Sequence, residues 1–125
     1  MTDLSIAATE SGLPFGVPGA ALDCPLEQAI RTVGGRWKML ILRALLLGGG
    51  QRFNALLRAM PEISAKELTR NLRELEQAGL VTHGPGEAGA IYELSPLGGT
   101  MLPVFRELGA FGTRLRMHRA VLAAA

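Results

Sequence analysis

The side chains best suited to bind a ligand are cations and hydroxyls that gather in one short stretch of the chain. These are Ser64, Lys66, Thr69, Arg70 and Arg73. Guanidinium, ammonium and hydroxyl groups donate hydrogen bonds to phosphate oxygens, and an arginine can also donate two parallel hydrogen bonds to the edge of a guanine. At these spacings most of the side chains would share one face of a helix. Their types and spacing predict a surface that binds nucleic acid.

The distribution of charge along the chain supports the same prediction. The formal net charge is only +2, but residues 31–73 contain nine lysines and arginines against two glutamates, and residues 1–30 contain four acids and no lysine or arginine. Neutralising phosphates requires local positive charge rather than a high total charge. Nucleic acid is therefore the expected partner, and double-stranded DNA once the helix-turn-helix described below is added. The alternative is that these cations only solvate the protein surface.

A helix from Ser64 to about residue 78 would position these side chains. Ser64 and Glu67 form a capping-box pattern, in which each side chain accepts a hydrogen bond from the other residue's backbone N–H. Three leucines fall on the opposite side of this helix, at positions 68, 72 and 75, and Gly79 can end it. The cationic face is then free to bind a partner, unless Arg70 and Arg73 pair with the glutamates at 67, 74 or 76 and only solvate the helix.

The other elements are predicted from apolar periodicity and from residues that start or end helices. Pro25 suits the first turn of a helix capped by Asp23 or Cys24, which would end before Gly34. Further helices are predicted from Arg36 to the glycines at 48–50, and over residues 53–60. Strands are predicted over residues 80–82 and 90–94, joined by a glycine- and proline-rich hairpin, and a last helix begins at Ser95.

Together these elements predict a mainly α fold with a small β-hairpin, the winged form of the helix-turn-helix. We expect residues 1–22 to form a flexible N-terminal arm, residues 23–118 the DNA-binding and dimerisation domain, and residues 119–125 a C-terminal tail. The last helix carries an apolar stripe that so small a domain cannot cover. Dimerisation through the terminal helices would bury that stripe.

The order of several short motifs resembles that of the HxlR-type winged-helix regulators of bacteria. The motifs are Cys24–Glu27, Gly34–Trp37, Ile41–Arg43, Arg52–Asn54, Ile63–Ser64, Leu72–Val81 and, in part, Tyr92–Gly98. The resemblance covers about seven tenths of the chain. It implies a transcriptional regulator that acts as a homodimer on a roughly palindromic operator. It also places Ser64, Lys66, Thr69, Arg70 and Arg73 in the recognition helix, and Arg52 and Asn54 at the start of the preceding helix.

The segment between the two predicted strands departs from this family pattern. It is shorter than usual and contains Glu87 where the family tends to carry basic residues. We therefore expect the wing to contribute less to DNA affinity here, and the recognition helix more. The same feature favours an alternative function, in which the winged helix is a protein-interaction module with weak DNA binding or none.

Cys24 is a candidate redox sensor, because some members of the resembled family use the cysteine at this position to sense oxidants, quinones or other electrophiles. A position near the start of a helix favours the thiolate. The neighbouring Leu22, Pro25 and Leu26 suggest instead an apolar setting in which the thiol only packs, and Asp23 would oppose thiolate formation. As the single cysteine of the chain, it excludes an internal disulfide.

Other classes of function lack support in the sequence. No nucleophile–base arrangement, phosphate-binding glycine loop or metal-ligand spacing is present, so we expect no enzymatic activity, metal or cofactor. No apolar stretch is long enough to span a membrane and no secretory signal is evident, so a cytoplasmic protein is expected. Trp37 could line a pocket for a small-molecule effector, although a tryptophan at helical spacing with Leu40 and Ile41 is more typical of a core.

Overall fold

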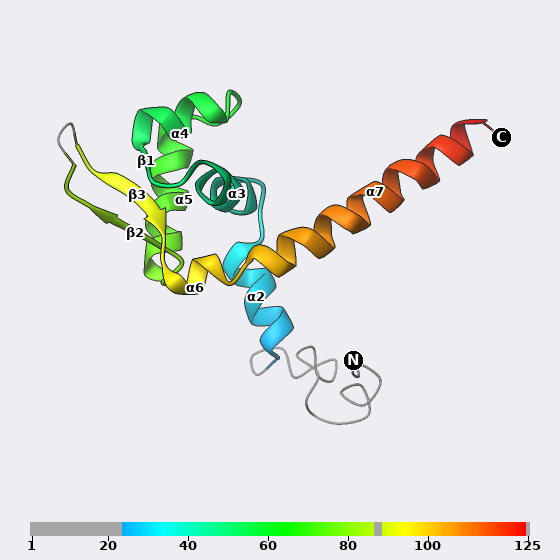
Figure 1. The fold of residues 1–125 in the computed structure, drawn as a ribbon, viewed down its shortest axis with the longest axis horizontal. Coiled ribbons are helices and arrows are strands. Elements are labelled where there is room, and N and C mark those ends of the chain that lie inside the picture. The colour runs from blue at the N-terminus through cyan, green and yellow to red at the C-terminus, as the bar shows by residue number, and fades with distance from the viewer. Residues whose placement is uncertain (1–23, 87–88, 125) are drawn as a thin grey trace.

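A computed structural model describes residues 24–86 and 89–124 of the chain, and the predicted N-terminal arm lies outside them (Figure 1). The elements run, in order, α2 (Pro25–Val33), α3 (Lys38–Gly48), β1 (Gln51–Arg52), α4 (Phe53–Ala59), α5 (Ala65–Gln77), β2 (Val81–Gly84), β3 (Ile91–Leu94), α6 (Pro96–Gly99) and α7 (Leu102–Ala124). This arrangement confirms the predicted mainly α winged helix-turn-helix. The two helices of the motif are α4 and α5.

The hydrophobic core forms where α3, α4 and α5 meet one another and the start of β2. Its fully buried side chains are those of Ile41, Leu42, Leu56, Leu68, Leu72, Leu75 and Val81. The three leucines of α5 belong to this set, as their spacing predicted. Trp37 also belongs to the core, with 7% of its surface exposed, which confirms the packing role over the pocket role.

The sheet has one strand more than the predicted hairpin. Its order is β1-β3-β2, all antiparallel, with Val81 opposite Leu94 at one end of the β2–β3 pair and Gly84 opposite Ile91 at the other. The added strand β1 places Gln51 opposite Tyr92. Two residues are too few to show the alternation of a strand, so the pairing depends on a partner about forty residues away in the sequence. It fixes the start of α4 to the wing.

A short turn divides the last predicted helix into α6 and α7. Ser95 caps α6, because its Oγ accepts a hydrogen bond from the backbone N–H of Gly98 at 3.0 Å and donates one to the carbonyl of Gly79 at 2.6 Å. Gly98 packs so closely on Leu80 that a Cβ atom built there would lie 2.2 Å from the Leu80 carbonyl oxygen. This contact fixes the direction in which the chain leaves the domain.

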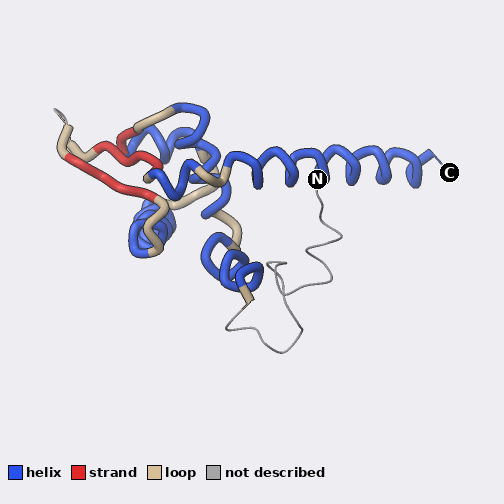
Figure 2. The backbone as a smooth tube through the Cα atoms, turned by 60° about the horizontal axis from the view of Figure 1, so that its bottom comes forward, coloured by secondary structure: helices blue, strands red, loops and turns tan. Residues whose placement is uncertain are grey.

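Helix α7 extends away from the rest of the domain (Figures 1 and 2). None of its residues is buried within the chain. It continues past residue 118, where the sequence suggested that a C-terminal tail begins, and ends at Ala124, because no glycine or proline interrupts residues 113–124. No helix in the described part of the chain combines the length and apolar content of a membrane span.

Candidate nucleic-acid interface

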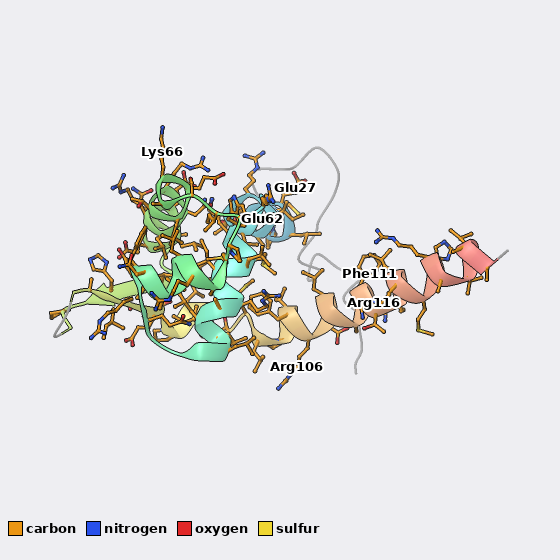
Figure 3. The ribbon with its side chains drawn as sticks, turned by 90° about the horizontal axis from the view of Figure 1, so that it is seen from above. Glu27, Glu62, Lys66, Arg106, Phe111 and Arg116 are labelled. Atoms are coloured by element: carbon orange, nitrogen blue, oxygen red, sulfur yellow. The ribbon has the colours of Figure 1, made fainter. Side chains whose placement is uncertain are left out.

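The outward face of α5 presents the cluster of polar side chains that the sequence predicted. Lys66, Thr69, Arg70 and Arg73 are all exposed, whereas Leu68 on the opposite face is fully buried. Figure 3 shows the Lys66 side chain pointing away from the domain. The arrangement follows from the helical repeat, because residues three and four apart project from the same side. Gln77 extends this face by one more turn, and its spacing from Arg73 would have identified it in the sequence.

The first turn of α5 is fixed by a complete capping box, which confirms the predicted start of the helix. Ser64 Oγ accepts a hydrogen bond from the Glu67 N–H at 3.0 Å, and Glu67 Oε1 accepts one from the Ser64 N–H at 3.0 Å. These bonds to Ser64, with smaller contributions from Trp37 and Arg36, lower the pKa of Glu67 below its ordinary value. The Ser64 hydroxyl therefore has a structural role in holding the helix start, whether or not it contacts a ligand.

The glutamates of α5 are each engaged by a residue outside the helix. Glu67 accepts a hydrogen bond from Trp37 Nε1 at 3.3 Å, Glu74 forms an ion pair with Lys38 at 2.6 Å, and Glu76 contacts His83 Nδ1. Within residues 24–86 and 89–124, the remaining ion pair joins Arg36 to Glu62. Among the described residues, neither Arg70 nor Arg73 forms an ion pair with these glutamates, so the alternative in which they only pair along the helix is not observed. Arg70 is still close enough to Glu74 to help lower its pKa, after the larger effect of Lys38.

A shallow hollow of about 640 Å³ opens beside the cationic face. One lining residue, Phe53, lies at the start of α4. The other six belong to α5 and are Ala65, Lys66, Glu67, Thr69, Arg70 and Arg73. The small Ala65 and the aromatic Phe53, neither of which was among the predicted site residues, contribute apolar surface to the hollow. Three cations beside apolar side chains could contact a sugar-phosphate backbone.

Arg52 and Asn54, the other two predicted site residues, flank the start of α4. Arg52 is exposed, occupies the cap position of α4 and pairs in β1 with Ile91. Asn54 is exposed in the first turn of α4 and directly follows Phe53, which lines the hollow. Both residues thus adjoin Phe53, but neither is itself among the residues that line the hollow. The position of the start of α4 depends on the β1–β3 pairing, which sequence alone did not predict.

Strands β2 and β3 of the wing contain no lysine or arginine of their own, although Arg52 of β1 pairs with Ile91 of β3. Residues 78–105 contain no lysine or arginine, and the tip residues 87 and 88, including the predicted Glu87, lie outside the described part of the chain. His83 packs on Tyr92 with ring centroids 5.2 Å apart and contacts Glu76 of α5. The described part of the wing thus braces the end of α5 and offers phosphate few donors.

Cys24 lies directly before α2 and is 2% exposed. Its carbonyl accepts a hydrogen bond from the Gln28 N–H at 3.0 Å, as the first helical turn requires. The position near the start of a helix is as predicted, and so is the buried setting that the neighbouring apolar residues suggested. An electrophile would reach the sulfur only after a local movement of the chain.

Comparison with known proteins places these features in a family. The chain matches the HxlR-like helix-turn-helix family over residues 32–120. It is 34% identical over 99 residues to an uncharacterised helix-turn-helix transcriptional regulator of Methanothermobacter thermautotrophicus, which covers 77% of this chain and 75% of the relative.

Two solved structures of regulators share the fold. Quinone-bound YodB from Bacillus subtilis superposes with a TM-score of 0.65 at 34% identity, over 71% of this chain and 96% of YodB. The redox regulator HypR in its reduced form gives a TM-score of 0.67 at 30% identity, over 81% of this chain and 99% of HypR. Both likenesses extend over nearly the whole of the compared structure.

Proposed function

The chain belongs to the HxlR-like helix-turn-helix family of transcriptional regulators, and we propose that it acts as a homodimer that binds a roughly palindromic operator through α5. In such a dimer the two copies of α5 would enter successive major grooves on one side of the DNA, about 34 to 36 Å apart. Arg70 and Arg73 would contact base edges or phosphates, and Lys66, Thr69, Arg52 and Asn54 would fix the protein on the DNA backbone.

One observation carries the DNA-binding proposal. The exposed face of α5 keeps its cations available, because the three glutamates of the same helix are engaged by Trp37, Lys38 and His83. A helix that carried its charges only for solubility would be expected to pair them along its own surface at spacings of three and four residues. The separation of acids and cations supports binding to a polyanion.

The homodimer is supported by the surface of α7. Its exposed apolar side chains repeat at alternating spacings of four and three residues, at Val104, Leu108, Phe111 and Leu115. This is the repeat by which two helices pack along a common seam. Two copies of α7 packed in this way would bury a surface that a single copy leaves in water, and would hold the two recognition helices at a fixed separation.

The first experiment is an electrophoretic mobility shift with DNA from just upstream of the protein's own gene, at two salt concentrations and with excess nonspecific competitor. A shift that resists the competitor and weakens steeply with salt supports the proposal. The double substitution Arg70→Ala with Arg73→Ala should abolish the shift while leaving the dimer intact. Absence of any shift at low salt would contradict the proposal and favour a protein partner for the winged helix.

We also propose that Cys24 makes the regulator responsive to electrophiles. The support is the position of the thiol at the start of α2, together with the relatives: YodB has structures with a quinone bound and after diamide treatment, and HypR is a redox regulator with oxidised and reduced structures. In such a reaction the thiolate sulfur would add to a ring carbon of a quinone and one quinone oxygen would take up a proton. The hydrogen of the attacked ring carbon would then move to the other oxygen, which gives a hydroquinone thioether.

The test compares the wild-type protein with Cys24→Ser. A quinone should weaken operator binding by the wild type and leave the Cys24→Ser protein unaffected, and mass spectrometry should find one adduct per chain. Equal operator affinity of the two proteins with and without the quinone would contradict the sensing role, without affecting the proposal that the protein binds DNA.

A further inference from the structure

Lys38, the first residue of α3, reaches across to the recognition helix. Its Nζ donates hydrogen bonds to Glu74 Oε1 at 2.6 Å and to Asn71 Oδ1 at 3.1 Å. The Lys38 side chain is 14% exposed, so its ammonium group lies mostly inside the protein, while Glu74 is 46% exposed. Asn71 is itself buried and donates from Nδ2 to the Glu67 carbonyl at 2.8 Å. One cation on α3 thus holds two polar residues of α5.

Glu74 occupies a sensitive position on the recognition helix. It follows Arg73 directly and lies four residues after Arg70, a spacing at which an acid and an arginine pair along a helix. It therefore borders the face that we propose to contact DNA, and a free carboxylate there would compete with phosphate for Arg70. The ion pair with Lys38 instead draws the carboxylate toward α3.

We propose that Lys38 is a positioning residue for DNA binding: it binds the Glu74 carboxylate, keeps that carboxylate from pairing with Arg70, and cancels a negative charge beside the bound phosphates. This inference rests on the proposed DNA-binding function and adds a residue that no inspection of DNA contacts would identify. Lys38 itself faces the interior of the domain, so it contributes to DNA affinity through Glu74.

The test is a double-mutant cycle with Lys38→Gln, Glu74→Gln and both together, measuring operator affinity over a series of salt concentrations. Lys38→Gln should weaken operator binding on the order of tenfold and make the salt dependence shallower by about one neutralised phosphate, because Glu74 then occupies Arg70. Glu74→Gln alone should bind at least as tightly as the wild type. The double variant should recover wild-type affinity, since it has no carboxylate to release.

Arg116→Gln on α7 is the matched control, because it also removes one positive charge but lies away from α5 (Figure 3). It should leave affinity and salt dependence unchanged. A merely structural role for Lys38, or a direct phosphate contact, would leave the double variant as weak as Lys38→Gln, and that result would overturn the proposal. So would wild-type binding by Lys38→Gln. If Lys38→Gln fails to fold, Glu74→Gln still tests the proposal, because weaker operator binding by Glu74→Gln than by the wild type contradicts it.

The failure of this inference differs from that of the proposed function. A wild-type protein that binds no DNA would overturn the proposed function itself. A wild-type protein that binds its operator, but shows no coupling between Lys38 and Glu74 in the cycle, overturns only the positioning role.

Discussion

Trp37 Nε1 donates a hydrogen bond to Glu67 Oε2 across 3.3 Å, and this bond joins the start of α3 to the first turn of α5. The other oxygen of the same carboxylate accepts from the Ser64 N–H and completes the capping box. One glutamate therefore both caps the start of α5 and anchors this helix to the core through a largely buried tryptophan.

The ionised form of Glu67 should stabilise the fold in a pH-dependent way. Its pKa is lowered first by the backbone N–H of Ser64, then by the Ser64 hydroxyl, the Trp37 indole and Arg36. A lowered pKa in the folded state means that the stabilisation is fully present above the ordinary pKa of a glutamate, and is lost as the pH falls through the folded value. The free energy of unfolding of wild type should therefore exceed that of Glu67→Gln at pH 7, and the difference should shrink below about pH 4.5.

Urea unfolding followed by the fluorescence of Trp37, the single tryptophan, provides the measurement. Glu107→Gln, on α7 and exposed, should unfold as the wild type does at each pH and serves as the control. A difference between wild type and Glu67→Gln that stays constant from pH 7 to pH 3 would refute the role of the ionised carboxylate.

Arg70 and Arg73 should contribute separately to the salt dependence of DNA binding. If each neutralises one phosphate, Arg70→Ala or Arg73→Ala should reduce the slope of log affinity against log salt by about 0.9. If one of them contacts a guanine instead, its loss should relax sequence preference at a single operator position and leave the slope nearly unchanged. Fluorescence anisotropy with labelled operator, over several salt concentrations, separates the two. Arg116→Ala is the control and should change neither the salt slope nor the sequence preference. If Arg70→Ala or Arg73→Ala also changes neither, the substituted arginine is excluded from the interface.

The apolar seam of α7 should determine the oligomeric state. Leu108→Glu or Phe111→Glu places a charge in the middle of the proposed helix–helix contact and should convert the dimer to a monomer in analytical ultracentrifugation. Operator affinity should fall with it, because each monomer then binds a half-site alone. Thr113→Glu adds the same charge on the opposite side of α7 and should leave the dimer intact. A monomeric wild type, or a dimer unaffected by either charge, would count against the seam.

Two neighbouring glycines of α6 should respond in opposite ways to alanine. A Cβ atom at Gly98 would meet the Leu80 carbonyl oxygen at 2.2 Å and Leu94 Cδ2 at 3.3 Å, whereas a Cβ atom at Gly99 would meet nothing within 4 Å. Gly98→Ala should lower the free energy of unfolding by roughly 1–3 kcal/mol, and Gly99→Ala should be neutral or raise it by up to about 1 kcal/mol. Thermal unfolding of the two variants is the measurement, and equal melting temperatures would contradict the close contact at Gly98.

Features with local causes were predictable from the sequence. The capping residues Ser64 and Glu67 gave the start of α5, and the leucine spacing gave its buried face, so the exposed positions of Lys66, Thr69, Arg70 and Arg73 followed. Pro25 and Ser95 likewise marked the starts of α2 and α6. Each of these signals acts within one helical turn.

Features that depend on distant partners were not predictable. Lys38 and Glu74 are 36 residues apart, and nothing in the local pattern distinguishes Lys38 from a solvated cation. Asn71 is buried among leucines only because Lys38 and the Glu67 carbonyl satisfy its amide. The strand β1 exists through its pairing with β3, and the turn between α6 and α7 follows from the close packing of Gly98 on Leu80.

The separation of roles around α5 has a consequence for the divergence of paralogous regulators. Anchoring and capping involve Ser64, Glu67, Asn71 and Glu74, while the outward positions 66, 70 and 73 take no part in the core, the capping box or the ion pairs of the described residues. Substitutions at the outward positions can therefore accumulate at little cost to folding. A duplicated copy of the gene would be free to acquire a new operator preference before losing its structure.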